Sequence, residues 1–419
     1  MTGEGVWVTG IGAVSAAGLG AVALGDLLVE GRTGVRPIPQ LGCVPAGLAE
    51  TPPSHPAGRH LDRSARFFLH AAEEAWRDAG LEDGRLDSAR CAVLEGSSLG
   101  PLAELLTEHT AQLAPSRHHR AHPSRLVRYM SGAGGAAFAQ LHRVRGPVFH
   151  LSAGSVSAAC AIGEAVARIA SGQMDIVVAG GAECPLHPDV LASFEAAGIL
   201  GSADPGDATC RPFDRRRTGT VLGEGGGVLI LESPAHARRR GAVPRAEVAG
   251  FGMSCESYSM TSPDPSGAGV AAAARDALGG LVPGDVGWIK AHGTGTRLND
   301  AAECRGLASL FGELLPGVPL TSLKPTLGHC LGASAAVEAV GAIMALERGV
   351  VPPTLGSEEP DPDLPLHQVA RSTHPTPSGV ALLLAESFGG RCAALVLRGP
   401  PDQRLGCSGS LEPVTVMAR

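Results

Sequence analysis

The sequence lacks the features that define several classes of protein. No apolar run approaches the ~20 residues that a transmembrane helix needs, and no basic segment precedes an apolar stretch at the N-terminus, so neither a membrane span nor a secretory signal is expected. Positive charge is not in excess, and the net charge of −7 argues against nucleic acid or an anionic membrane as a partner. The ten cysteines form no CxxC pair and no repeated metal spacing, which indicates reduced thiols in a cytoplasmic protein.

Aromatic residues are also scarce, at 3%, whereas 58 glycines and 32 prolines indicate a globular chain rich in small residues and turns. With 419 residues the chain is long enough for two core-forming halves. Short apolar segments, such as VWVTGIGAV (6–14) and GGVLILE (226–232), alternate with helix-length amphipathic segments, and the pattern restarts after about residue 235. We therefore predict an α/β fold with two halves, residues 1–235 and 236–419.

Three segments place chemically useful residues at the ends of predicted strands. GPVFHLSAGSVSAACAIG (146–163) begins as a strand and continues as a helix, so a residue at SAGS lies beside the free N–H groups of a helix N-terminus. Such a position favours a nucleophile and the oxyanion formed when it attacks an acyl group. AHGTGTRLNDAAE (291–303) carries His292 on a glycine turn, and LKPTLGHCLGASA (323–335) carries Lys324 and His329 before a helix. Taken singly, each histidine is better explained as structural than as catalytic.

Together, and in this order, the three segments resemble the β-ketoacyl synthase family of fatty-acid and polyketide assembly. Members of that family carry a cysteine at a strand–helix turn, a histidine in HGTGT and a histidine in a K…GH…GA turn. Further matches are VTGIGAVSAAG (8–18), AGGAE (179–183), CRPFDRRRTGTVLGEGGGVLILE (210–232) and VPPTLG (351–356), so the resemblance spans roughly residues 5–398. It implies the thiolase-type fold, with two pseudo-equivalent α/β halves in five αβαβα layers, usually as a dimer.

Two residues compete for the position of the family's nucleophile, Ser155 and Cys160. In the family this residue lies nine positions after the glycine of GP and 28 before the glutamate of GGAE. Counting forward from Gly146 and back from Glu183 both lead to position 155. The resemblance therefore puts Ser155 in the place of the cysteine, and Cys160 is predicted to be a packing residue inside the helix.

A serine changes the chemistry of that position. Its hydroxyl is a far weaker acid than a thiol, so a helix N-terminus cannot ionise it and a base must take its proton. His292 and His329 are the candidate bases, and we favour His329. The resemblance implies that these two imidazoles otherwise hydrogen-bond the carbonyl of an extender thioester, and that Lys324 and Glu303 belong to the surrounding polar network.

The family's closing loop, NSFGFGG, corresponds to LAESFGG (384–390). In the family, the N–H at the position of Phe388 completes an oxyanion hole with that of the nucleophile. Glu386 and Ser387 stand where the family has phenylalanine and glycine; we expect the hole to be intact and the movement of the loop to be restricted. The substrate-binding residues implied by the resemblance are Thr294, Thr296, Phe388, Gly389 and Gly390.

An acyl-serine is less electrophilic toward a carbanion than an acyl-cysteine, so carbon–carbon bond formation should suffer more than other transfers. Three hypotheses follow: an acyltransferase of polyketide or fatty-acid biosynthesis with an acyl-Ser155 intermediate, a malonyl-carrier-protein decarboxylase, or a non-catalytic chain-length-factor-like partner subunit. We favour the acyltransferase, because such partner subunits have typically lost the histidine of HGTGT. An engineered cysteine-to-serine exchange is a further alternative, which the divergent neighbours Ala153, Val156 and Ala158 argue against.

The resemblance also implies partners. These are an acyl carrier protein, whose phosphopantetheine arm carries the substrate, and a second ketosynthase-family subunit in a homodimer or heterodimer. The basic segments 117–128 and 215–217 are candidate surfaces for an acidic carrier, with scattered surface arginines as the alternative. No metal or bound cofactor is implied, since the histidine-rich segment 116–128 has no carboxylate or cysteine at ligand spacing.

Overall fold

The computed structural model describes residues 5–82, 86–112, 123–201, 210–365 and 368–400. Its main strands are β1 (Val6–Ser15), β5 (Cys91–Gly96), β6 (Val148–Leu151), β7 (Ile176–Glu183), β8 (Gly225–Glu232), β9 (Ala246–Cys255), β10 (Trp288–Lys290), β11 (Leu320–Thr321), β14 (Val380–Ser387) and β15 (Arg391–Arg398). Within the described residues they join in one sheet with the order β11-β10-β14-β15-β9-β1-β8-β7-β5-β6.

The strand order repeats in the two halves of this sheet. The first half has the order β6-β5-β7-β8-β1 and the second has the order β11-β10-β14-β15-β9. In both halves the first two pairings from the outer edge are parallel and the next two are antiparallel. The first strands of the halves, β1 and β9, pair antiparallel with each other. Two pseudo-equivalent halves are thus confirmed. The boundary that we propose after residue 235 lies within α8 (Pro234–Arg239), between β8 and β9.

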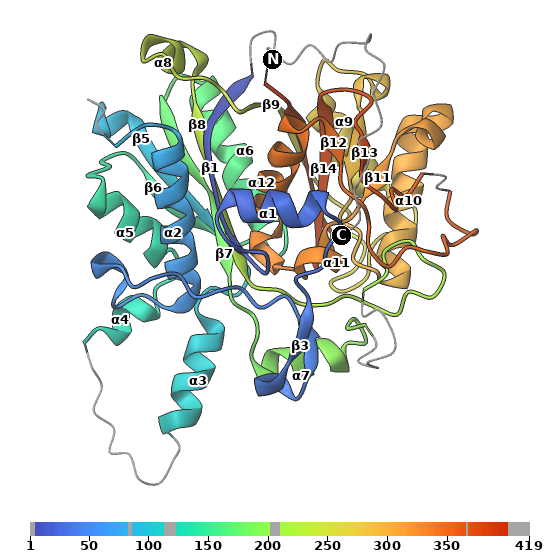
Figure 1. Cartoon of the computed structure of the whole chain (residues 1–419), viewed down its shortest axis with the longest axis horizontal. Helices are drawn as coiled ribbons and strands as arrows, with labels where there is room; N and C mark the ends of the chain where they lie inside the picture. Colours follow the sequence, from blue (N-terminus) through green and yellow to red (C-terminus); the bar gives the residue numbers. More distant parts are fainter. Residues whose placement is uncertain (1–4, 83–85, 113–122, 202–209, 366–367, 401–419) are drawn as a thin grey trace, which may run out of the picture.

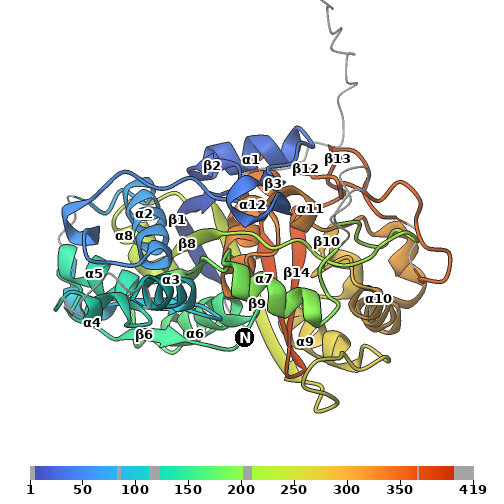
Figure 2. The ribbon, with the colours of Figure 1, turned by 90° about the horizontal axis from the view of Figure 1, so that it is seen from below.

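Helices form three layers around these strands (Figures 1 and 2). The central layer is α6 (Ser157–Ala170) and α12 (Ser334–Glu347), and both helices contact strands of both halves. The outer helices are α2 (Arg63–Asp78) and α5 (Ala133–Leu141) on the first half, and α9 (Ala268–Leu278) and α10 (Arg297–Phe311) on the second. The predicted αβαβα arrangement is therefore present, as in the thiolase-type fold.

Small residues allow the two central helices to lie between the strands. In α12 every residue from Ser334 to Leu346 is buried. A Cβ at Gly163 of α6 would lie 2.4 Å from the ring of Phe251 on β9, so this close approach needs a glycine. The scarcity of aromatic residues thus goes with a core that is filled largely by alanine, valine and leucine.

Shorter elements complete the described chain. They are α1 (Ala21–Val29), α3 (Leu102–Gln112), α4 (Arg125–Arg128), α7 (Pro188–Ala196), α11 (Lys324–Leu327), β2 (Gly18–Leu19), β3 (Arg36–Ile38), β4 (Val44–Ala46), β12 (Val350–Val351) and β13 (His374–Pro375). In the part of the chain that the structure describes, no helix combines the length and the hydropathy that crossing a bilayer would require.

Candidate active site

The turn between β6 and α6 carries Ser155. β6 ends at Leu151 and α6 begins at Ser157, and Gly154 adopts the left-handed φ of +67° that this turn requires. Ser155 is half-buried and lies at the positive end of the helix dipole. Cys160 lies inside α6, as predicted, and its sulfur packs 3.7 Å from that of Met253. The hydroxyl of Ser155, rather than this thiol, therefore occupies the junction, and burial raises the pKa of the Cys160 thiol.

The turn that precedes α12 brings His329 to Ser155. Ser155 Oγ lies 3.2 Å from His329 Nε2, and His329 Nδ1 lies 2.9 Å from Ser334 Oγ. When Nδ1 carries the proton and donates to Ser334, Nε2 is free to accept from Ser155. Backbone hydrogen bonds hold the turn in place: the N–H of His329 donates to the carbonyl of Val221, and its carbonyl accepts from the N–H of Gly223.

His292 lies beside His329, with ring centroids 5.2 Å apart and ring planes at 82°. Burial lowers the pKa of both imidazoles well below the usual value, and the nearby charges of Lys324 and Lys290 lower it further. Both rings are therefore neutral at pH 7. A neutral imidazole can accept the proton of a hydroxyl or donate to a carbonyl, but its lowered pKa requires an accepted proton to move on quickly.

Two buried lysines share one carboxylate behind the histidines. Lys324 Nζ donates to the carbonyl of His292 and lies 3.1 Å from Glu338 Oε1, while Lys290 Nζ pairs with the other oxygen of Glu338. Despite its burial, the pKa of Glu338 is lowered, because both lysines stabilise its charge. Lys290 and Glu338 are not among the site residues predicted from the sequence. The available signal was a single carboxylate in the apolar segment SAAVEAVGAIMAL (334–346).

The HGTGT turn is held by Glu303, which belongs to the polar network as predicted. Its two carboxylate oxygens accept the backbone N–H groups of His292 at 2.5 Å and Gly293 at 2.8 Å. Burial raises the pKa of Glu303. The hydroxyls of Thr294 and Thr296 lie 2.9 Å apart and hydrogen-bond to each other. Glu303 thus positions the backbone that carries His292, and substrate binding by the two threonines remains a prediction.

The turn between β14 and β15 lies against the turn that carries Ser155, and one of the two N–H donors of the expected oxyanion hole already has a partner. The N–H of Ser155 donates to Ser387 Oγ at 2.9 Å, so the hydroxyl that replaces a glycine occupies this donor. Phe388 is 49% exposed, which leaves its ring in reach of a substrate. Gly389 and Gly390 have left-handed φ values of +80° and +70°. Substrate binding by these three residues remains a prediction.

Glu386 is buried beneath this turn with one oxygen unsatisfied. Among the described residues, its Oε1 has no hydrogen-bond partner. Burial raises the pKa of Glu386 well above its usual value, and the carboxylates of Glu303 and Glu256 raise it further. Within the described chain one group of side chains, Glu256, Glu386 and Cys392, has donor atoms close enough together, within 4.8 Å, to hold a metal ion. Neither His292 nor His329 belongs to this group.

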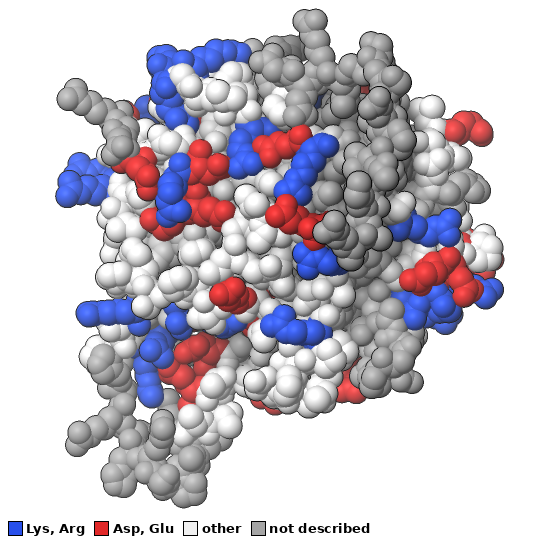
Figure 3. Space-filling view, in the orientation of Figure 1, with Lys and Arg blue, Asp and Glu red and all other residues white. Residues whose placement is uncertain are grey.

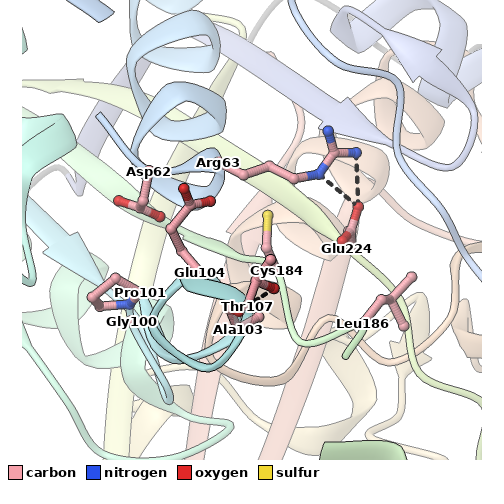
Figure 4. Close-up of a pocket in the computed structure, with 10 residues that line it drawn as sticks. All are labelled: Asp62, Arg63, Gly100, Pro101, Ala103, Glu104, Thr107, Cys184, Leu186 and Glu224. Atoms are coloured by element: carbon pink, nitrogen blue, oxygen red, sulfur yellow. Dashed lines mark hydrogen bonds and ion pairs between the residues drawn. The ribbon is translucent and has the colours of Figure 1, made fainter. Parts of the chain in front are cut away.

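A pocket of about 120 Å³ lies away from these residues, beside α2 and α3 (Figure 4). Arg63 reaches Glu224 across one wall, with a distance of 2.9 Å between Nη2 and Oε2. The other lining residues are Asp62, Gly100, Pro101, Ala103, Glu104, Thr107, Cys184 and Leu186. No predicted site residue is among them. The candidate active site is therefore the place where the turns that carry Ser155, His292 and His329 meet, rather than this pocket.

The arginines predicted to receive a carrier protein are paired with acidic residues. Arg216 lies 2.9 Å from both Asp214 and Glu358. Further pairs are Arg215–Glu359, Arg217–Asp361, Arg125–Glu108 and Arg128–Glu108. Figure 3 shows the same mixing of basic and acidic side chains on one face. Residues 117–122 of the predicted basic segment lie outside the described residues. A purely basic docking surface is thus not supported at 215–217.

Residues 3–237 match the family described as Beta-ketoacyl synthase, N-terminal domain, and residues 245–358 match Beta-ketoacyl synthase, C-terminal domain. The chain belongs to the β-ketoacyl synthase family.

Relatives of this β-ketoacyl synthase family member match over nearly their whole length. The putative polyketide beta-ketoacyl synthase 1 of Streptomyces cyaneus is 37% identical, over 95% of this chain and 99% of the relative. The tetracenomycin polyketide synthase ketoacyl synthase alpha subunit of Streptomyces glaucescens is 34% identical, over 95% and 98%. Nodulation protein E of Rhizobium sp. (strain N33) is 34% identical, over 94% and 98%.

Solved structures show the same β-ketoacyl synthase architecture. A type II PKS ketosynthase, solved with its acyl-carrier protein and bound to the hexaketide, has a TM-score of 0.86 at 30% identity and covers 94% of this chain and 99% of its own. The ishigamide ketosynthase/chain length factor has a TM-score of 0.86 at 29% identity, with the same coverage of both chains. The thiolase-type fold is thus confirmed.

Proposed function

We propose that this chain is a ketosynthase-like acyltransferase that accepts acyl groups from a carrier protein onto Ser155. The observation that carries the proposal is the 3.2 Å contact between Ser155 Oγ and His329 Nε2 at the N-terminus of α6. A hydroxyl nucleophile needs such a base, and the helix dipole favours the developing negative charge. The relatives named as polyketide synthase subunits support polyketide biosynthesis as the pathway class, and fatty-acid biosynthesis stays the alternative.

The proposed acyl transfer exchanges a thioester for an oxygen ester. Ser155 Oγ attacks the thioester carbonyl, the new C–O bond forms, and the C–S bond to the phosphopantetheine arm breaks. His329 Nε2 accepts the proton of Ser155 and gives it to the departing thiolate. Ser334 holds the ring through Nδ1, and Lys324 holds the turn of His292 through its carbonyl. The product is an oxygen ester, which favours passage of the acyl group to an acceptor other than a carbanion.

A second candidate function is decarboxylation of malonyl-carrier protein, and the two adjacent neutral imidazoles favour it. Both rings can donate a hydrogen bond to the thioester carbonyl while the C–C bond to the carboxylate breaks and carbon dioxide leaves. The resulting enolate then takes up a proton. This reaction needs His292 and His329 but does not need Ser155, so mutagenesis separates it from acyl transfer.

We further propose an acyl carrier protein and a second ketosynthase-family subunit as partners, in a homodimer or a heterodimer. Two solved relatives support this: one is a ketosynthase with its acyl-carrier protein and another is a ketosynthase/chain length factor. The edge strand β6 supports a subunit contact, because its apolar residues Val148 and Phe149 are 39% and 44% exposed. Substrate would arrive on phosphopantetheine, with no other cofactor, and the cytoplasm remains the expected location.

Intact-protein mass spectrometry after incubation with acyl-carrier protein tests the proposal. We expect an acyl adduct on the wild type that disappears in Ser155→Ala, and chain extension, if any, only in Ser155→Cys. A different result would favour decarboxylation over acyl transfer. In that case the wild type forms no adduct but releases carbon dioxide from malonyl-carrier protein, and the His292→Ala and His329→Ala variants do not release it. An absence of both activities, with tight binding to a cysteine-containing ketosynthase, would replace both by the partner-subunit hypothesis.

A further inference from the structure

Ser387 makes a contact with the nucleophile turn that a glycine in its place could not make. Its Oγ accepts the N–H of Ser155 at 2.9 Å, although the two residues are 232 positions apart. The contact is tight: a Cβ on Gly154 would lie about 2.0 Å from the same oxygen. The Ser387 hydroxyl therefore fills the space directly beside the Ser155 backbone.

This N–H is the group that an acyl carbonyl oxygen needs. When Ser155 Oγ attacks a thioester, negative charge develops on the carbonyl oxygen next to the backbone of the nucleophile. The N–H of Ser155 lies at the N-terminus of α6, where the helix dipole strengthens it as a donor. One N–H cannot serve the Ser387 oxygen and an incoming oxyanion equally well, so the two compete for it.

The hairpin turn that carries Ser387 is held in place by contacts of its own. The N–H of Gly389 donates to the carbonyl of Met260 at 2.9 Å, and Arg391 donates to the carbonyl of Phe388 at 3.2 Å. The neighbouring Gly390 has a left-handed φ of +70°. With the turn fixed at both sides, rotation of the Ser387 side chain about χ1 is the smallest movement that releases the Ser155 N–H.

We propose that Ser387 is a positioning residue that sets the rate of acyl transfer by occupying the oxyanion donor of Ser155 at rest. The oxyanion that develops during the attack displaces the Ser387 hydroxyl, and the hydroxyl returns when the acyl group leaves. This inference rests on the proposed acyl transfer to Ser155 and adds the residue that controls it. Because the displaced contact is a single hydrogen bond, its removal should speed acylation about three- to tenfold.

The test measures the rate of acyl-adduct formation by quenched-flow mass spectrometry on full-length protein with acyl-carrier protein. Ser387→Ala and Ser387→Gly should raise the maximal acylation rate about three- to tenfold, with the half-saturating concentration of acyl-carrier protein largely unchanged. Ser387→Thr, which retains a hydroxyl, should show no increase. Ser171→Ala, at the far end of α6 where the hydroxyl contacts the Arg168 carbonyl, is the matched serine-to-alanine control and should leave the rate unchanged.

The possible outcomes are distinct. Adducts that form at the same rate, or more slowly, in Ser387→Ala and Ser387→Gly would overturn this inference and leave the proposed acyl transfer standing. An equal acceleration in Ser387→Thr would overturn it too, because the hydroxyl would then be irrelevant. A Ser155-dependent adduct is one that the Ser155→Ala substitution abolishes. If neither the wild type nor any Ser387 variant forms such an adduct, the proposed function fails and this inference fails with it. Circular dichroism of each variant verifies the fold.

Discussion

The histidine side and the nucleophile side of the site differ in how their polar groups are paired. On the histidine side, the charges of Lys290 and Lys324 meet that of Glu338, and Glu303 accepts two backbone N–H groups of the HGTGT turn. These groups are fixed before any substrate arrives, which is the condition for electrostatic catalysis.

The nucleophile side is arranged differently. The N–H of Ser155 is occupied by the hydroxyl of Ser387, and one oxygen of the neighbouring Glu386 is buried with no hydrogen-bond partner among the residues that the structure describes. Three of the residues that depart from the family pattern, Ser155, Glu386 and Ser387, therefore meet at one place in the fold. The comparison teaches that the histidine side keeps the residues of the family pattern, whereas the side that carries Ser155 departs from that pattern at several adjoining positions.

Removing the carboxylate that balances the histidine side should have the largest effect. Glu338→Gln removes the one carboxylate that pairs directly with the buried ammonium groups of Lys290 and Lys324, and it should lower the free energy of unfolding by about 3–5 kcal/mol. Urea unfolding followed by circular dichroism measures this loss. Glu30→Gln, whose side chain is half exposed, is the control and should change little. Equal stability of the two variants would contradict the idea of a preorganised histidine side.

The two histidines should differ in their effect on acylation. His329→Ala removes the base in contact with Ser155 and should slow adduct formation about 100-fold, within the usual contribution of a general base. His292→Ala should have a smaller effect on this step, because His329 still contacts the hydroxyl. Single-turnover acylation rates give the comparison, and a larger loss in His292→Ala would assign the base to the other ring.

Glu386 should make stability depend on pH. Its pKa in the folded protein is raised, so the native state holds a proton that the unfolded chain releases at lower pH. Its favourable contribution is therefore complete below the unfolded pKa and is lost as the pH rises through the folded pKa, by at most about 1.4 kcal/mol per pH unit. Glu386→Gln should gain stability relative to the wild type between pH 5 and pH 8 in urea unfolding. If the unfolding free energies of the wild type and Glu386→Gln change with pH in parallel, Glu386 stays ionised in the folded protein and the prediction is wrong.

The smallest effect is expected at Cys160. Cys160 lies inside α6, where its thiol has a raised pKa and packs against Met253 of β9. Cys160→Ala should therefore remove a packing contact without removing a nucleophile. The initial rate of adduct formation should stay close to that of the wild type. Loss of the adduct in Cys160→Ala would instead identify Cys160, inside the helix, as the nucleophile in place of Ser155 at the junction.

Much of this arrangement could be predicted from sequence. The strand–helix junction at Ser155, the helix around Cys160 and the two histidine turns follow from short segments whose apolar pattern and glycines define the local structure. The five layers follow from the resemblance, and the contacts of α6 and α12 with strands of both halves, together with the outer helices, confirm them.

Contacts between distant residues could not be predicted in the same way. The pairing of Lys290 with Glu338 spans 48 positions, and the contact of Ser155 with Ser387 spans 232. An intact oxyanion hole was the reasonable expectation from the two retained glycines of the loop, but the side-chain direction of Ser387 depends on how two turns from different halves meet. The ion pairs of Arg216 with Asp214 and Glu358 could likewise not be predicted, because Glu358 reaches Arg216 only in the folded chain.

The most direct test of the central claim is to locate the acyl group by tandem mass spectrometry of proteolytic peptides after incubation with acyl-carrier protein. We predict the label on Ser155, as an ester that resists neutral hydroxylamine. A label on Cys160 that neutral hydroxylamine removes, or no covalent label on any peptide, would contradict the account.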